Sequence, residues 1–279
     1  MKENPYLPMK AVIEGIVQET HSPDLDVKTF RVRFTDGGSM DFMPGQFVEF
    51  SIPGAGECPF GFASMAYPDG DFDLTIKRTG KVTNIIHALD IGATVWIRGP
   101  FGNTFPLELM EDNDLLFVAG GIGLAPLRPF IQYVLDSNNR KKYGKVDMLL
   151  AARTSKDHCF TYDYETWGGI DKTTVKQTID RDEPDWKGLV GFPHNLIKDF
   201  TLDFNRLYAV LCGPPIMIKA VQNSLMEMGM PLERIYTTLE MRMTCGVGKC
   251  AKCNIGHTYI CVDGPVFNMA ELSTMPDEY

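Results

Sequence analysis

Four cysteines near the end of the sequence have the spacing of ligands to a metal centre. Cys245, Cys250, Cys253 and Cys261 form the pattern Cys-x4-Cys-x2-Cys-x7-Cys, whereas the other three cysteines are scattered. In a reducing compartment such a group more often holds a metal than forms disulfides. The first three spacings match the plant-type ferredoxin pattern, which predicts that the four thiolates bind a [2Fe–2S] cluster. The alternative is a structural zinc site, which favours two separate Cys-x2-Cys knuckles, and this segment has one.

Two turns that directly follow apolar segments indicate a dinucleotide site. GGIGLAPLRP has the form G-x-G-x-x-P, with a proline where the dinucleotide fingerprint has a glycine, and CGPPIM follows about 90 residues later. Glycines let the backbone approach a pyrophosphate, and amides at a helix N-terminus can bind it. Either turn alone could be tight packing, but two at the ends of parallel strands frame one crevice. The residues expected there are Gly120, Gly121, Gly123, Ala125, Pro126, Cys212, Gly213, Pro214 and Met217.

Two further segments are weaker signals when read alone. IKRTGKVTNIIHAL (76–89) places a glycine turn and basic side chains before a helix, with Thr83 or Asn84 as the expected N-cap; a plain capped helix would look the same. ECPFGFASM (57–65) offers aromatic faces for a flat ring, although it also suits a barrel core. The candidate cofactor contacts are Pro59, Phe60, Gly61, Phe62, Ser64, Ile76, Lys77, Arg78, Gly80, Lys81, Val82, Thr83 and Asn84.

The segments that must position these motifs show two different patterns of apolar and polar residues. Up to about residue 105, short segments that alternate apolar and polar residues are separated by turn signals; examples are 27–34, 45–52, 71–78 and 94–99. This pattern predicts a small antiparallel β-barrel.

After Pro106, apolar strands alternate with helices, which predicts βαβ units on a parallel sheet. We expect strands within 114–120, 145–153, 173–179, 206–213 and 234–240, and helices within 126–137 and 216–229. The expected units are 1–110, 111–238 and a cysteine-rich tail, 239–279. The tail looks too short for its own core, so we expect a metal centre to stabilise it.

Composition excludes several classes of protein. The 279 residues are 44% hydrophobic and 23% charged, which is typical of a globular protein, and the net charge of −9 argues against nucleic-acid binding. The longest apolar segment, 115–127, contains glycines and a proline and is too short to cross a bilayer. The polar opening MKENPYLPMK resembles no secretory signal, so we expect a cytoplasmic protein.

In combination, the motifs resemble the ferredoxin–NADP reductase superfamily. The order of barrel, GQF turn, RGPFG, GGIGLAP, CGPP and four-cysteine tail carries the resemblance, which covers roughly residues 10–267. TLEMRMTCGVGKCAKC and CVDGPVF are the most specific stretches. They are most similar to the electron-transfer subunits of dihydroorotate dehydrogenase and the gamma subunits of sulfhydrogenases.

The resemblance implies FAD on the barrel, NAD(P) on the second domain and a [2Fe–2S] cluster in the tail. Residues 80–84 match the flavin diphosphate loop, and Cys212 and Glu240 would lie near the nicotinamide. One departure concerns the flavin strand, which in the superfamily usually reads Arg-x-Tyr-Ser or Arg-Pro-x-Ser. Here the positions are Cys58, Pro59, Phe60 and Gly61. Flavin binding then depends more on Lys77, Arg78 and backbone amides, and Ser64 is the candidate replacement for the missing hydroxyl.

The choice between NAD and NADP depends on residues 151–157, AARTSKD. Arg153 and Lys156 could bind a ribose 2′-phosphate, whereas Asp157 could accept from a ribose hydroxyl. We favour NAD, because no second arginine or tyrosine clamp for the phosphate follows nearby.

These features predict an NAD(P)H-dependent flavin and iron–sulfur oxidoreductase subunit. Such chemistry belongs to the cofactors and requires no acid–base pair. Because no further large domain is visible, we expect the cluster to exchange electrons with a partner subunit of hydrogenase or heterodisulfide-reductase type. The alternatives are a free-standing NAD(P)H reductase of ferredoxin or flavin, and a redox-inert module with a zinc-stapled tail.

Overall fold

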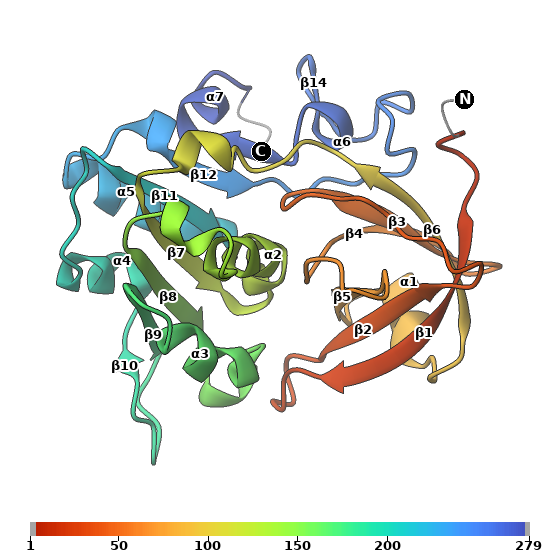
Figure 1. Cartoon of the computed structure of the whole chain (residues 1–279), viewed down its shortest axis with the longest axis horizontal. Coiled ribbons are helices and arrows are strands. Elements are labelled where there is room, and N and C mark those ends of the chain that lie inside the picture. Colours follow the sequence, from red (N-terminus) through yellow and green to blue (C-terminus); the bar gives the residue numbers. More distant parts are fainter. Residues whose placement is uncertain (1–3, 277–279) are drawn as a thin grey trace.

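The computed structural model describes residues 4–276 and contains two large domains that lie side by side (Figure 1). The first is a six-stranded antiparallel sheet in the order β4-β3-β6-β1-β2-β5. Its strands are β1 (Met9–Gln18), β2 (Val27–Phe34), β3 (Phe47–Ile52), β4 (Gly56–Gly61), β5 (Phe72–Lys77) and β6 (Thr94–Phe101). A bridge between Phe62 and Leu74 joins the two edges, so the sheet closes into the expected barrel.

Alternation of side chains explains the barrel. On β2 and β5, residues such as Phe30, Val32 and Leu74 point inward and are fully buried. A short helix, α1 (Lys81–His87), follows β5. Its N-cap is Gly80, so the expected N-cap at Thr83 or Asn84 is wrong. Thr83 lies at the third helical position, and its hydroxyl accepts hydrogen bonds from the amides of Thr79 (2.9 Å) and Gly80 (2.8 Å).

The second domain is a seven-stranded sheet in the order β10-β9-β8-β7-β11-β12-β15. All neighbours pair in parallel except β12 and β15. Its strands are β7 (Asp114–Gly120), β8 (Val146–Ala152), β9 (Thr173–Ile179), β10 (Leu189–Val190), β11 (Leu207–Cys212), β12 (Ile235–Thr238) and β15 (Val266–Asn268). Its main helices are α2 (Leu124–Leu135), α3 (Thr161–Gly168), α4 (Pro193–Leu196) and α5 (Pro215–Glu227).

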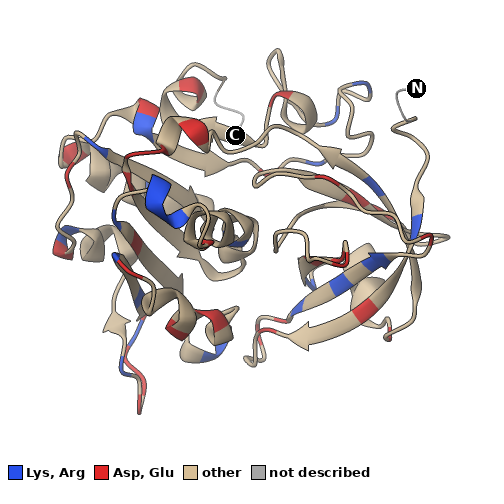
Figure 2. Cartoon of the chain, viewed as in Figure 1, with Lys and Arg blue, Asp and Glu red and all other residues tan. Residues whose placement is uncertain are grey.

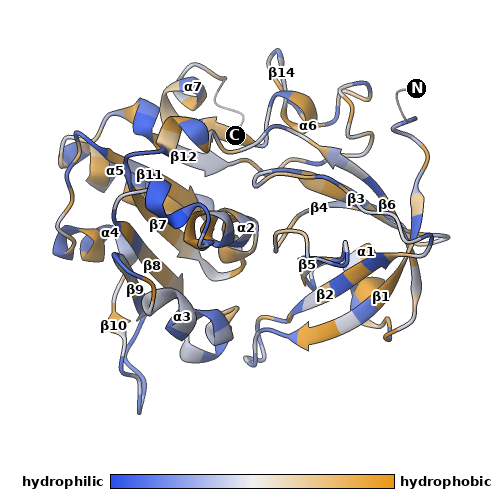
Figure 3. Ribbon diagram, viewed as in Figure 1, coloured by the Kyte–Doolittle hydropathy of each residue, from blue (hydrophilic) through white to orange (hydrophobic). Residues whose placement is uncertain are grey.

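Helices cover both faces of this sheet, which is why its central strands are continuously apolar (Figure 3). Leu115 and Phe117 of β7 pack with α2 and α3 in one core, whereas Leu116 and Val118 pack with α5 in another. No helix in residues 4–276 is both long and apolar enough to cross a bilayer. Along the ribbon in Figure 2, acidic and basic residues are interspersed over both domains.

The cysteine-rich tail packs on both large domains. Strand β15 pairs with β12 and thereby becomes the last strand of the second sheet. Ile255, Ile260 and Met269 belong to the same core as Leu116 of β7 and Phe101 of β6. The tail also contains the hairpin β13 (Asn254–Ile255) and β14 (Thr258–Tyr259) and the helices α6 (Ile260–Asp263) and α7 (Met269–Ser273). Apolar packing therefore contributes to the stability of the tail, beyond the metal centre that its sequence predicts.

Candidate functional site

Strand β4 is the part of the barrel that is most open to a flat ligand. It is an edge strand, and none of its six residues is buried. Phe60 is half-buried, with its ring edge-to-face against Phe50 at a centroid distance of 6.2 Å. Gly61 has no side chain, and a Cβ placed there would lie 3.5 Å from Cβ of Pro126 on α2. The expected flavin strand thus lies against the helix that begins at the expected dinucleotide turn, and both fit a stacked pair of rings.

The loop before α1 presents exposed cations beside this strand. The side chains of Lys77 and Lys81 are exposed, while Arg78 donates to Oδ1 of Asn84 (3.0 Å) and pairs with Asp26 (3.6 Å). A Cβ on Gly56 of β4 would lie 3.0 Å from Val82, so the loop adjoins the β3–β4 hairpin. Exposed lysines and amides next to an open strand fit a diphosphate.

Three of the expected flavin contacts have their side chains inside the barrel. Phe62 is 2% exposed and stacks on Phe42 at a centroid distance of 3.5 Å, and Ile76 is fully buried. Ser64 is 1% exposed, and its hydroxyl oxygen accepts from the amide of Asp73 (2.9 Å). These placements argue against side-chain contact with a cofactor. The proposal that Ser64 replaces the hydroxyl that the flavin strand lacks therefore loses support.

The two glycine turns meet, but their glycines have different roles. Gly121 has a φ of +55°, and no atom lies within 4 Å of the position that a Cβ would take, so its backbone is open to a ligand. Gly123 is buried, and a Cβ there would collide with the carbonyl oxygen of Cys212. Gly120 likewise faces Met217 and Pro214, at 2.5 and 3.0 Å from such a Cβ. Gly121 is therefore the glycine placed to touch a pyrophosphate, while Gly120 and Gly123 let the two turns pack.

Cys212 lies at the end of β11, where it is 5% exposed. Its sulfur is 3.2 Å from the hydroxyl of Thr238. Burial raises the pKa of the Cys212 thiol to about 12, so the residue stays protonated and can donate a hydrogen bond. The Glu240 side chain is exposed near this strand end. Neither residue forms a nucleophile–base pair, in keeping with hydride exchange between cofactors.

In the segment after β8, the acidic and the basic candidates for contact with the ribose differ in exposure. Asp157 is buried, and its carboxylate accepts from the hydroxyls of Thr154 (2.8 Å) and Ser22. Arg153 and Lys156 are exposed. The prediction that Asp157 binds a ribose hydroxyl loses support, because both carboxylate oxygens already have partners within the protein.

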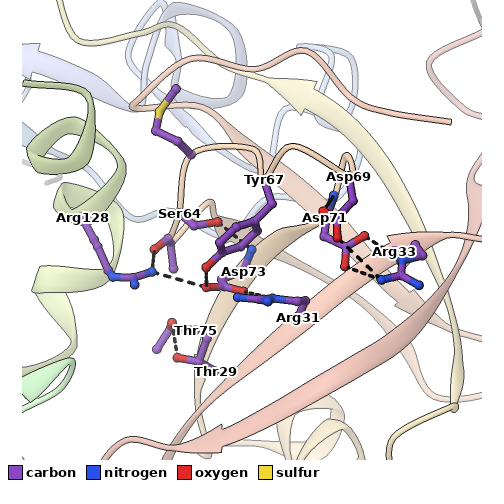
Figure 4. Close-up of polar contacts among 12 residues, drawn as sticks. Thr29, Arg31, Arg33, Ser64, Tyr67, Asp69, Asp71, Asp73, Thr75 and Arg128 are labelled. Atoms are coloured by element: carbon purple, nitrogen blue, oxygen red, sulfur yellow. Dashed lines mark hydrogen bonds and ion pairs between the residues drawn. The ribbon is translucent and has the colours of Figure 1, made fainter. Parts of the chain in front are cut away.

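A buried arginine that the sequence did not single out joins the two large domains. Arg128, one turn into α2, lies 3.4 Å from Asp73 of β5 (Figure 4) and donates to the carbonyl of Ala63 (2.7 Å). On its own domain it pairs with Asp163 (2.7 Å). Gln132, one turn further along α2, accepts from the amide of Met65 (2.8 Å). Helix α2 is thereby held along the segment that continues the flavin strand. The only sequence signal was a charge on the apolar face of a helix.

The four cysteines converge on a loop rich in amide donors. All seven cysteines of the chain, each within the described residues, are free thiols. The amides of Val247 (3.5 Å) and Lys249 (3.3 Å) donate to Sγ of Cys245, and the amide of Gly248 donates to Sγ of Cys261 (3.2 Å). Although burial opposes it, these amides and Cys250 lower the pKa of Cys245 to about 6. Such donors stabilise thiolates, the form that binds iron.

The thiols meet as two pairs. Cys245 contacts Cys250, and Cys253 contacts Cys261, with burial and this second contact raising the pKa of Cys261 to about 12. Within residues 4–276, no three histidine, cysteine, aspartate or glutamate side chains converge on a single ion position. Neighbouring thiols of this kind fit a [2Fe–2S] cluster, which four cysteines hold.

A second charged group lies where the barrel faces the cluster loop. Glu49 of β3 is fully buried, and neither carboxylate oxygen has a hydrogen-bond partner. Burial and the nearby charge of Glu57 raise the pKa of Glu49 to about 8. Glu49 lies opposite Arg98 in the pairing of β3 with β6.

Comparison with known proteins accounts for most of the chain. Residues 15–105 match the oxidoreductase FAD-binding domain family, and residues 117–223 match the oxidoreductase NAD-binding domain family. Residues 240–273 match the iron–sulfur cluster binding domain of dihydroorotate dehydrogenase B. The three matches follow the barrel, the α/β domain and the cysteine-rich tail.

Similar proteins of comparable length are subunits of redox complexes. Sulfhydrogenase 1 subunit gamma of Pyrococcus furiosus is 38% identical over 98% of this chain and 95% of its own length. The probable electron transfer subunit of dihydroorotate dehydrogenase B from Thermococcus kodakarensis is 32% identical over 92% of this chain and 96% of its own. Among solved structures, an NADH-dependent reduced ferredoxin–NADP oxidoreductase has the same fold, with 24% identity and a TM-score of 0.74 over 100% of this chain and 95% of that one.

The open glycine gives a test of the dinucleotide turn. In Gly121→Val, a branched side chain occupies the space beside the backbone, and we expect the KM for NADH to rise about tenfold or more while flavin and iron contents stay normal. Steady-state kinetics and cofactor analysis measure both. The control is Gly37→Val, which has a similar φ of +72° and equally open surroundings but lies in a distant barrel turn. Equal effects of the two substitutions on KM would show that backbone strain, not ligand contact, is responsible.

Glu49 should make stability depend on pH. Its pKa is about 8 in the folded protein, above the ordinary value of 4.5, so the folded state binds its proton more tightly than the unfolded state. Its contribution to stability is therefore greatest below pH 4.5 and falls as the pH rises toward 8. We expect Glu49→Gln to remove this loss, so that its melting temperature rises relative to wild type between pH 5 and 8. The exposed Glu227→Gln is the control, and parallel pH profiles for wild type and Glu49→Gln would contradict the assignment.

Proposed function

The chain belongs to the ferredoxin–NADP reductase-like flavoproteins, with the electron-transfer subunits of sulfhydrogenases and dihydroorotate dehydrogenases as relatives, and we propose that it carries electrons between NAD(P)H and a partner redox subunit. It is an oxidoreductase subunit with FAD-binding, NAD-binding and iron–sulfur domains. The proposal concerns the path of the electrons and the partner that exchanges them.

The contacts of the barrel with each of the other two units carry the proposal. On one side, Gly61 of β4 adjoins Pro126 of the dinucleotide turn. On another, Phe101 of β6 is 2.7 Å from a Cβ placed on Gly246 of the cluster loop. A flavin on β4 would therefore lie between a nicotinamide and a cluster, the order that sequential electron transfer requires.

The residues of the chain bind and orient the cofactors and adjust their properties. When bound, FAD supplies the exchange of a hydride with nicotinamide and of single electrons with the cluster. Lys77, Lys81 and the amides near Gly80 would hold its diphosphate, and Gly121 would admit the pyrophosphate of the dinucleotide. The amides of residues 247–249 hold the cysteine thiolates by hydrogen bonds. Arg128 keeps α2 and β4 in register, which fixes the distance between the two ring sites.

The partner is inferred from the relatives, which are subunits of multi-subunit enzymes. We propose another redox subunit, of hydrogenase or heterodisulfide-reductase type, that exchanges electrons with the cluster. Purification from the native host under gentle conditions tests this: a stoichiometric second redox subunit is expected. A chain that purifies alone and reduces ferredoxin at full rate would instead be a free-standing reductase.

Loss of one cluster ligand should leave flavin reduction by NADH intact while it stops electron transfer from the flavin to the partner. In Cys250→Ser, we expect the iron–sulfur signal in electron paramagnetic resonance to disappear or change, because serine is a poor ligand for this cluster. NADH should still bleach the flavin, while electron delivery to the partner falls at least about 100-fold, as expected when a link in the path is lost. Cys159→Ser, which removes a buried thiol outside the loop, is the control. A normal cluster signal in Cys250→Ser, or undiminished delivery without it, would contradict the proposed path.

The exposed cations after β8 give a prediction for dinucleotide choice. We propose that the chain uses NADH and that Arg153 provides what affinity it has for a 2′-phosphate. Arg153→Ala should raise the KM for NADPH about tenfold, as expected for a charged hydrogen bond, and leave the KM for NADH within about twofold. Lys156→Ala is the comparison and should change the KM for NADH little. An equal rise in both KM values for Arg153→Ala would place this arginine on the shared part of the two dinucleotides.

A further inference from the structure

Arg98 lies at the junction of the barrel, the cluster loop and the N-terminal segment. It is on β6 between Ile97, which fills the barrel core, and Gly99, so its side chain leaves the barrel on the outer face. That face is covered by the tail, and Arg98 is only 6% exposed. A guanidinium is rarely buried to this extent unless its donors are paired.

Every N–H donor of this guanidinium has a partner. Nε and Nη2 donate to the carboxylate of Glu57 on β4, with an Nε–Oε2 distance of 3.1 Å. The other donors reach three backbone carbonyls: Thr244 from Nη2 (3.1 Å), Cys245 from Nη1 (3.1 Å) and Pro5 from Nη1 (3.0 Å). Lysine has neither the number nor the planar arrangement of donors to replace this set.

These partners lie in three segments, two of which carry expected cofactor contacts. Glu57 directly precedes the expected flavin residues 58–61, and Cys245 is an expected cluster ligand. One rigid group therefore sets the separation of the flavin strand from the first cysteine of the loop. The guanidinium contacts Glu57 and the cluster loop together, and it donates directly to the carbonyl of Cys245.

The local charges give the arginine an electrostatic role as well. Glu57 is the carboxylate that pairs with Arg98, and Glu49 lies opposite Arg98 in the register of β3 and β6, so Arg98 is the cation of this group. A cluster that gains one electron becomes more negative by one charge. A permanent positive charge beside a ligand favours that reduced state, and burial strengthens the interaction relative to water.

We propose that Arg98 is a positioning residue for the cluster: it holds the first ligand at a set distance from the flavin strand and raises the reduction potential of the cluster. This inference rests on the proposed function, since it requires the [2Fe–2S] cluster. When bound, the cluster would exchange one electron at a time with the flavin and with the partner. Arg98 gains and loses neither proton nor bond in either transfer.

The test is a redox titration of the purified holoprotein, followed by the paramagnetic signal of the reduced cluster. For Arg98→Gln, we expect the equilibrium constant for cluster reduction to fall about tenfold, which is a potential about 59 mV lower for a one-electron couple. Bleaching of the flavin by NADH should keep its rate. Arg33→Gln is the matched control, because Arg33 also pairs with a buried carboxylate, Asp71 (2.9 Å), and its three ion-pair partners all belong to the barrel.

Two further variants separate charge from position. Arg98→Lys keeps the positive charge but loses the forked arrangement of donors. We expect its equilibrium constant for cluster reduction to stay within about twofold of wild type, while amide hydrogen exchange in residues 244–250 becomes faster. Glu57→Gln removes a negative charge while leaving the arginine, so its potential should rise. This variant also decides the question if Arg98→Gln does not fold.

Each outcome has a distinct meaning. If the wild-type protein contains zinc or lacks the reduced-cluster signal, the proposed function fails and the inference fails with it. If wild type has the cluster but Arg98→Gln and Glu57→Gln both leave the potential unchanged, the inference alone is overturned. Opposite shifts in those two variants, with unchanged Arg33→Gln, support it.

Discussion

The contact between helix α2 and the barrel is the constraint on which the other sites depend. Helix α2 begins at the dinucleotide turn, and Arg128 fastens it to the carbonyl of Ala63, two residues beyond β4. A shift of this helix would separate the two ring sites, and hydride exchange tolerates little error in distance. Glu19 reinforces the junction from the barrel side by accepting from the amide of Phe160 (2.8 Å), which is held in the left-handed region at a φ of +59°.

The cores show that the three functional units are one packed structure. One core combines Val27 and Ala63 of the barrel with α2 and α3, and the other combines Phe47 of the barrel with the tail. Each of these junctions contains a buried arginine. Arg128 lies where the barrel meets the expected dinucleotide site, and Arg98 lies where it meets the cluster loop. Both guanidiniums bind backbone carbonyls as well as carboxylates, so they fix main-chain positions and not only charges.

Local patterns predicted the elements well and their contacts poorly. Strands 27–34, 114–120 and 173–179 have the expected bounds, since alternation and apolar runs are properties of the strand itself. The family, the cofactors and the cysteine loop also followed from spacing and resemblance. Phe62 and Ser64 differ from expectation because both sides of their segment are apolar, and only barrel closure decides which side faces inward. Sequence patterns do not reveal the burial of Arg98, Arg128 and Glu49, because it depends on the docking of distant segments.

The pairing of β12 with β15 has a consequence for the loop that carries the four cysteines. The segment between these strands, residues 239–265, leaves the sheet and returns to an adjacent position, so both of its ends are fixed by main-chain hydrogen bonds. Closing a loop costs entropy that grows only slowly with length, and here the sheet and the apolar core offset that cost. Both ends of the thiol loop are therefore held in place by contacts that do not involve its cysteines.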